Sequence, residues 1–120
     1  MSMFRVSVTA RNPARRELVS QPVSLLVDTG AELSWLPAGM LREAGIEPEG
    51  MRVFTLASGQ RLERRTGYAI LHAEGFTTID EVTFAGDGDI NLLGVRTIEG
   101  FGVLVDNIGH RLVAMPTRGT

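Results

Sequence analysis

The chain has 120 residues, of which 43% are apolar, enough for one modest hydrophobic core but not for two independent cores. Its 12 basic and 14 acidic residues give a net charge of −2 and are scattered along the sequence, so charge favours neither nucleic acid nor an anionic membrane as a partner. The absence of cysteine excludes disulfides, thiolate metal ligands and a thiol nucleophile.

The apolar runs are short. None approaches the roughly 20 residues of a membrane-spanning helix, and the first residues lack the apolar core of a signal peptide. We therefore expect one domain covering residues 1–120, located in the cytoplasm.

The first half of the chain predicts short strands and one short helix. Apolar and polar residues alternate from Phe4 to Thr9, which predicts a strand with one face in water. Leu18 to Val27 predicts a second strand whose end is apolar on both faces. Pro37 suits the first turn of a two-turn helix that continues to Ala44 and is closed by Gly45.

The second half predicts further short strands joined by turns. Ser58 and Gly59 supply the tight turn of a first hairpin, and Glu74-Gly75 supplies the turn of another. The expected strands are 53–56, 62 onward, 68–73, 76–79, 81–84, 103–105 and 112–115, with a short helix over Thr97 to Phe101 ended by Gly102. This pattern predicts an all-β barrel or sandwich with one or two short helices.

The triplet Asp28-Thr29-Gly30 follows the apolar run 23–27 and precedes Ala31. A strand that ends in a carboxylate, with threonine and glycine forming the turn, fixes that carboxylate through the backbone. Taken alone, the triplet is more typical of an ordinary turn or helix cap, because aspartate bonds nearby backbone and glycine tolerates positive φ.

Three segments together resemble the retropepsin-like (retroviral-type) aspartic proteases, in their small bacterial single-domain form. They are Leu26–Ala31, the hairpin Leu56–Leu62, and Asn91–Gly94 followed by a short helix, and their order and spacing match from about Phe4 to Met115. The resemblance implies a closed all-β barrel with a flap hairpin, in a single domain over residues 1–120 that carries half of an active site.

The same resemblance implies roles for particular residues. Asp28 from each of two chains would form the catalytic pair of a homodimeric aspartic endopeptidase. Thr29, Gly30 and Gly94 would support the active-site loop, with glycine required at position 94 because the chain passes close behind that loop. The substrate would contact Ala31, Glu32 and the flap tip at Ala57, Ser58, Gly59 and Gln60.

The implied chemistry needs no metal or cofactor. Two carboxylates about 3 Å apart share one proton, so one takes a proton from water while the other protonates the scissile carbonyl. The flap would close over an extended protein or peptide segment, with no nucleic acid or membrane involved. His72 and His110 lack partners at metal-ligand spacing, and Trp35 is expected in the core.

Alternatives remain open at this point. The same fold could serve as a non-catalytic dimeric peptide-binding or scaffolding domain, or the triplet could occur by chance in an unrelated small β-barrel. Many members of the family carry an arginine, or a methionine followed by aspartate, after the glycine, whereas this chain reads Gly94-Val95-Arg96-Thr97. Whether the offset Arg96 pairs with Glu32 is therefore open at this point. The flap tip also has a single glycine, Gly59, which suggests a stiffer or differently shaped lid.

Overall fold

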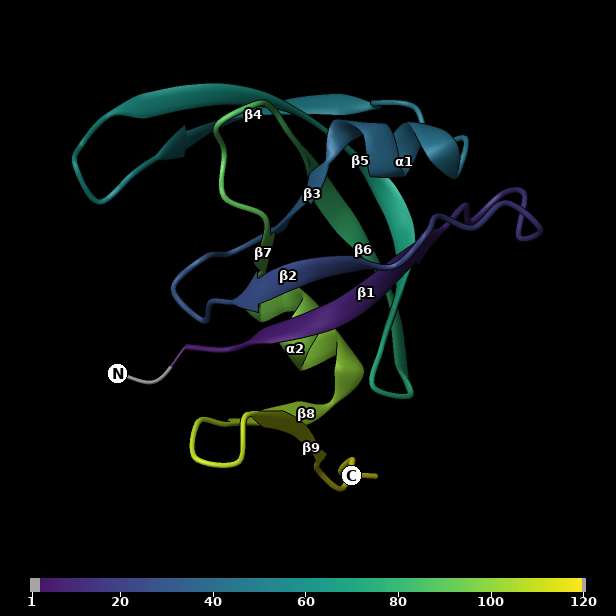
Figure 1. Ribbon diagram of the computed structural model, residues 1–120, viewed down its shortest axis with the longest axis vertical. Coiled ribbons are helices and arrows are strands. Elements are labelled where there is room, and N and C mark those ends of the chain that lie inside the picture. Colours follow the sequence, from purple (N-terminus) through teal and green to yellow (C-terminus); the bar gives the residue numbers. More distant parts are fainter. Residues whose placement is uncertain (1–2, 120) are drawn as a thin grey trace.

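The computed structural model describes residues 3–119 and is built mainly from β-strands, which confirms the mainly β prediction (Figure 1). The strands are β1 (Arg5–Arg11), β2 (Val23–Val27), β3 (Ser34–Pro37), β4 (Gly50–Thr55), β5 (Arg61–Ala73), β6 (Phe76–Ala85), β7 (Leu92–Leu93), β8 (Val103–Asp106) and β9 (Arg111–Ala114), and the helices are α1 (Ala38–Glu43) and α2 (Val95–Phe101).

The main sheet has the strand order β1-β2-β7-β3-β6-β5-β4. β1 pairs with β2 along Arg5–Val8 and with β5 along Thr9–Arg11. Within the described residues, β1, β2, β7, β3, β6 and β5 therefore form a closed ring of paired strands. β4 lies outside this ring and pairs only with the first half of β5. β8 and β9 form a separate two-stranded sheet, with α2 between them and the main sheet (Figure 1).

β5 is one unbroken strand of 13 residues, where the sequence pattern predicted two shorter strands. The predicted break fell near Gly67, but this glycine marks a close approach between chain segments. A Cβ there would lie 2.9 Å from the Glu47 carbonyl oxygen and 3.0 Å from the Phe84 ring. β6 is likewise continuous over the range predicted as two strands.

β2 is shorter than predicted, because the chain from Leu18 to Pro22 is not a strand and makes only an isolated bridge, between Val19 and Arg11. Pro22 has no backbone N–H to donate to a ladder. β3 was not predicted as a strand at all. Its first three residues are all buried, because Ser34 bonds Thr97 of α2 and Leu36 packs in the core, while Trp35 contacts Phe54, so no alternation reveals the strand.

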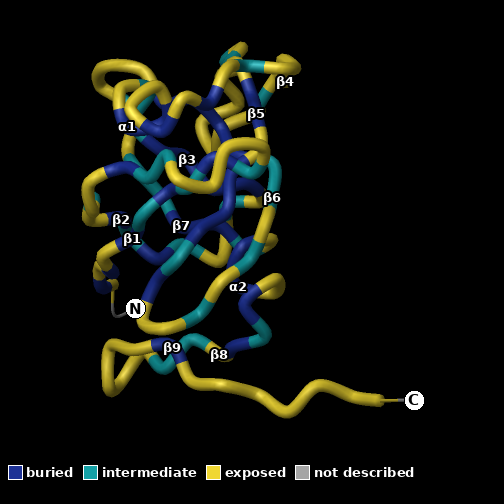
Figure 2. The backbone as a smooth tube through the Cα atoms, turned by 90° about the vertical axis from the view of Figure 1, so that its right-hand side faces the viewer, coloured by how far each residue is buried: buried dark blue, intermediate teal, exposed yellow. Residues whose placement is uncertain are grey.

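The core fills the space enclosed by the ring and under the two helices, as the buried stretches in Figure 2 show. α2 packs against it with Ile98 and Phe101 and ends, as predicted, at Gly102, whose φ of 71° is left-handed. α1 packs with Met40 and Leu41 and is followed, as predicted, by the left-handed Gly45. Both helices are therefore held by an apolar face, since neither has a side-chain N-cap.

The β8–β9 hairpin is apolar on both faces. Val103 and Leu112 face the core, whereas the cross-strand pair Leu104 and Val113 faces outward and is exposed. The turn between the strands holds Ile108, 97% exposed.

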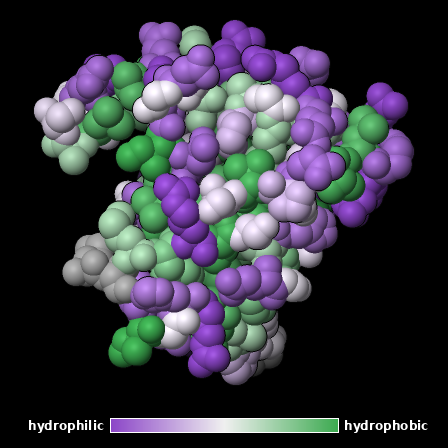
Figure 3. Space-filling view, in the orientation of Figure 1, coloured by the Kyte–Doolittle hydropathy of each residue, from purple (hydrophilic) through white to green (hydrophobic). Residues whose placement is uncertain are grey.

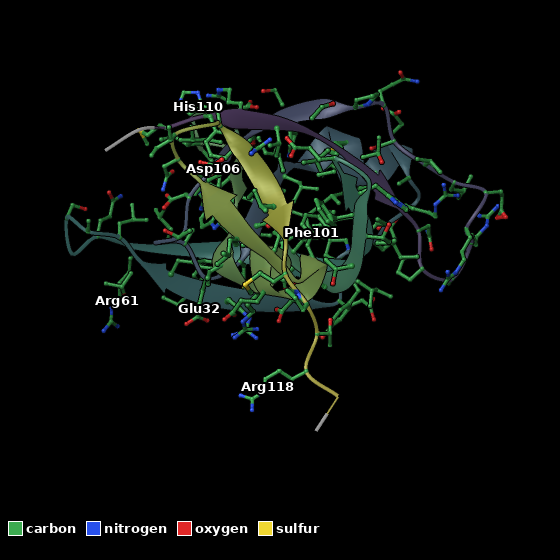
Figure 4. The ribbon with its side chains drawn as sticks, turned by 90° about the horizontal axis from the view of Figure 1, so that it is seen from below. Glu32, Arg61, Phe101, Asp106, His110 and Arg118 are labelled. Atoms are coloured by element: carbon green, nitrogen blue, oxygen red, sulfur yellow. The ribbon has the colours of Figure 1, made fainter. Side chains whose placement is uncertain are left out.

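The turn itself is well braced. The Asp106 carboxylate accepts the N–H groups of Ile108 and Gly109, and the Arg111 guanidinium donates to it as well. These contacts lower the pKa of Asp106, with the N–H groups as the main cause. Seen from below, Asp106 and His110 lie at this end of the hairpin, and the His110 ring stacks on Phe4 (Figure 4).

Candidate active site

Asp28 lies at the end of β2, half-buried, directly after the buried Val27. Its backbone N–H donates to the Leu93 carbonyl at 3.0 Å, which ties the start of the loop to β7. Its Oδ1 accepts the Gly30 N–H at 2.9 Å. The backbone of its own turn therefore fixes the carboxylate, as an Asx-type turn does.

The segment after β7 passes directly behind this loop. The N–H of Val95 donates to the Ala31 carbonyl at 2.8 Å, and that of Arg96 donates to the Glu32 carbonyl at 3.1 Å. A Cβ on Gly94 would lie only 2.4 Å from the Leu33 carbonyl oxygen and 3.0 Å from that of Ala31. Glycine is thus required at position 94 for steric reasons, since its φ of −89° is open to any residue.

A cleft of about 620 Å³ opens above the loop, beneath the β4–β5 hairpin. Asp28 and Gly30–Leu33 line its floor, while Trp35 and Leu92 line its wall. The roof is formed by Arg52–Ala57. In the space-filling view the hairpin projects at upper left over a notch in the body (Figure 3). The cleft combines an apolar wall with a few polar groups, a composition typical of ligand sites.

An aromatic contact joins the roof to the wall. The Trp35 and Phe54 rings lie with centroids 4.8 Å apart and planes tilted by 58°. Trp35 is buried, as predicted, with 7% of its surface exposed, but it also lines the cleft. The sole tryptophan of the chain therefore reports on this site.

Two arginines that pair across the hairpin strands anchor it to the body. Arg52 donates twice to Glu81, at 2.7 Å each, and Arg64 donates to Asp89 at 2.7 and 2.9 Å. These hydrogen bonds lower the pKa of Glu81 and of Asp89 and raise that of both arginines. The base of the hairpin is thus held by two forked charge pairs.

Arg96 does pair with Glu32, through an Nη2–Oε2 distance of 3.0 Å. Both side chains are largely exposed, so the pair contributes little to stability, but it orients the Glu32 carboxylate at the rim of the cleft. Glu32 points out from the body in Figure 4.

The structure brings together only part of the residue set predicted from sequence. Asp28, Gly30, Ala31, Glu32 and Ala57 line the cleft. Ser58, Gly59 and Gln60 lie further along the hairpin, outside the lining, and Thr29 is exposed beside it.

The residues that line the cleft but were not predicted as site residues are Leu33 on the floor, Trp35 and Leu92 on the wall, and Arg52, Val53, Phe54, Thr55 and Leu56 on the roof. The sequence signal for the roof was the apolar stretch 53–56, which precedes the turn at Ser58 and Gly59.

The chain matches no protein-family model, and a search of curated proteins found no relative. Within residues 3–119, no three histidine, aspartate or glutamate side chains gather in a way that could hold a metal ion. The same residues contain no helix long and apolar enough to cross a membrane.

Proposed function

We propose that this protein is a homodimeric, retropepsin-like aspartic endopeptidase in which each subunit supplies one Asp28. The observation that carries the proposal is the placement of Asp28, which the backbone fixes on the floor of a cleft roofed by a projecting hairpin. A turn aspartate of the ordinary kind needs neither a cleft nor a segment packed behind it. In this proposal the ring of β1, β2, β7, β3, β6 and β5 is the retropepsin barrel, and the β4–β5 hairpin is the flap.

A second copy would supply the other carboxylate. With two Asp28 side chains about 3 Å apart, one proton is shared between them. The ionised member takes a proton from a bound water, which attacks the scissile carbonyl while the protonated member donates to the carbonyl oxygen. The resulting tetrahedral intermediate is not attached to the enzyme.

The side of the molecule that carries Asp28 has features suited to a second copy. The loop after β2, the tip of the β4–β5 hairpin and the turn after β8 all lie at the left of Figure 1. Thr29 is exposed there, available to bond its counterpart beneath the carboxylates. Ile108 is held out on the braced turn of the β8–β9 hairpin, whose Leu104 and Val113 are also exposed, and apolar side chains gathered on one exposed element are typical of a contact surface.

The substrate would be an extended segment of protein. β4 is the last strand in the order of the main sheet, with β5 on one side only among the described residues, so its free edge can take up a peptide as an added strand. The apolar wall at Trp35 and Leu92 favours apolar side chains next to the scissile bond.

The test is cleavage of a proteome-derived peptide library by the purified chain at several pH values, beside Asp28→Asn prepared identically. We expect cleavage by the wild type alone, because the amide side chain cannot act as a base while it keeps nearly the same shape. Trp35 emission should still change when Asp28→Asn binds a substrate peptide, since this side chain lines the cleft.

The outcomes separate the two functions. Equal cleavage by both proteins would contradict the proposed mechanism. Peptide binding without cleavage, by a dimer, would favour the non-catalytic peptide-binding or scaffolding domain.

A further inference from the structure

A chain of buried polar groups runs from the segment behind the Asp28 loop to β6. The Gly94 N–H donates to Ser34 Oγ at 2.9 Å, and Ser34 Oγ lies 2.6 Å from Thr97 Oγ1. Thr97 Oγ1 in turn lies 3.4 Å from Asp80 Oδ2, a long contact. Ser34 and Thr97 are fully buried, so water does not reach their hydroxyls, whereas Asp80 at the end of the series is half-buried.

The direction of these hydrogen bonds depends on Asp80. The Gly94 N–H can only donate, and the short contact between the two hydroxyls uses one proton. If Asp80 is ionised, the Thr97 hydroxyl donates to it and the Ser34 hydroxyl donates to Thr97, so all three bonds point the same way. Aligned bonds of this kind polarise and strengthen one another.

If Asp80 is protonated, its own O–H can donate to Thr97, and the order reverses. The Thr97 hydroxyl then donates to Ser34, and the hydroxyl proton of Ser34 is left without an acceptor within this series of hydrogen bonds. An unsatisfied buried hydroxyl is unfavourable, and Ser34 becomes a weaker acceptor for the Gly94 N–H.

We propose that Asp80 is a positioning residue for Asp28, acting through Thr97 and Ser34 on the hydrogen bond that holds Gly94 behind the 28–32 loop. The coupling to Asp28 is short, because the neighbouring Leu93 carbonyl accepts the Asp28 N–H at 3.0 Å. The catalytic meaning of this role rests on the proposed function, whereas the hydrogen-bond chain does not.

The surroundings of Asp80 allow its ionisation to change. Burial raises the pKa of Asp80, while the Glu81 N–H, the Thr97 hydroxyl and Arg96 act in the opposite direction. The charged groups that face it are Arg96 on α2 and Glu81 on its own strand, and Glu81 is largely neutralised by Arg52 from β4. The pKa of Asp80 is therefore raised above that of an exposed aspartate, with burial as the main cause.

The test follows the Gly94 amide by ¹H–¹⁵N NMR of the full chain between pH 4 and 8. We expect its chemical shift to titrate in the wild type and the titration to be lost in Asp80→Asn. The matched control is Asp87→Asn, an exposed aspartate in a turn, which should leave the titration unchanged. A Gly94 shift that is independent of pH, or a titration that persists in Asp80→Asn, would overturn the proposal.

A second variant covers the case in which Asp80→Asn does not fold. Thr97→Val keeps the shape of the side chain but removes the hydroxyl, so it too should abolish the Gly94 titration. A Gly94 titration that persists in Thr97→Val would contradict the proposed series of hydrogen bonds. In the peptidase assay, Asp80→Asn should lower kcat by up to about 100-fold with KM unchanged and remove one ionisation from the pH profile. If the wild type cleaved no peptide but its Gly94 amide titrated with Asp80, the proposed function would be refuted, whereas the coupling of Asp80 to Gly94 would be supported.

Discussion

Gly94→Ala is the sharpest perturbation of the loop that carries Asp28. The added Cβ would lie 2.4 Å from the Leu33 carbonyl oxygen and 2.5 Å from its carbon. Ordinary van der Waals contact begins at about 3.4 Å, so the two backbone segments must separate by roughly 1 Å. Neither side can yield by rotating a side chain, because the Leu33 atoms belong to the backbone.

The magnitude follows from what that separation breaks. Backbone bonds from Val95 to Ala31 and from Arg96 to Glu32 join the two segments, and the Gly94 N–H bonds Ser34. Losing these three at about 1 kcal/mol each lowers the free energy of unfolding by about 3 kcal/mol. For 120 residues at about 2.1 cal/mol/K each, the unfolding entropy is about 0.25 kcal/mol/K, so Tm should fall by about 12 °C.

The assay is calorimetry of both glycine variants. Gly39→Ala is the matched control, because Gly39 lies in α1 with no atom within 4 Å of the added Cβ. Alanine should leave that helix unchanged or stabilise it by up to about 1 kcal/mol. If Gly94→Ala melted within about 2 °C of Gly39→Ala, the claim that the chain passes tightly behind the loop would be refuted.

Two further predictions concern the roof and the outer surface. Asp89→Asn should lower the free energy of unfolding by about 2 kcal/mol at pH 7 in urea titrations, because Arg64 loses its charged partner. Arg64 holds the pKa of Asp89 low, so this stabilisation is complete above the ordinary carboxyl pKa of about 4 and is lost as pH falls through the pKa of the folded state. The difference in unfolding free energy between wild type and Asp89→Asn should therefore narrow in acid. A difference that stays constant down to pH 2 would contradict this prediction. Ile108→Thr should weaken self-association about tenfold by analytical ultracentrifugation, while Ile79→Thr, also exposed, should leave it unchanged; equal effects would place the interface elsewhere.

The sequence was sufficient for the parts of the fold that rest on local chemistry. Gly45, Gly75 and Gly102 end their elements with the positive φ that glycine tolerates, as predicted. The Asp28 loop could also be placed, because an apolar run followed by aspartate, threonine and glycine is a local signal.

The parts that could not be predicted depend on contacts distant in sequence. Gly67 resembles a strand break, but it lies within an unbroken β5, where the close passage of Glu47 and Phe84 leaves no room for a side chain. β3 has no alternation because distant segments cover both of its faces: Thr97 of α2 bonds Ser34, and Phe54 of the hairpin contacts Trp35. The ion pair between Arg52 and Glu81 spans 29 positions, and nothing local marks either residue as the partner of the other.

The architecture of β5 constrains how a peptide could reach the cleft. One half of this strand forms the roof of the cleft with β4, and the other half closes the ring with β1. The roof is therefore continuous with the barrel and is not attached to it through a flexible loop. Arg52 and Arg64, directly opposite each other, fix the hairpin to the body at its base. Under the proposed function, the bending that admits a peptide should occur beyond this pair, between Val53 and Leu62, where no side chain is fully buried and the ladder faces water. The tip at Gly59 is unobstructed, because an added Cβ would meet no atom within 4 Å, so the contact of Phe54 with Trp35 is the one described tie that bending there must break.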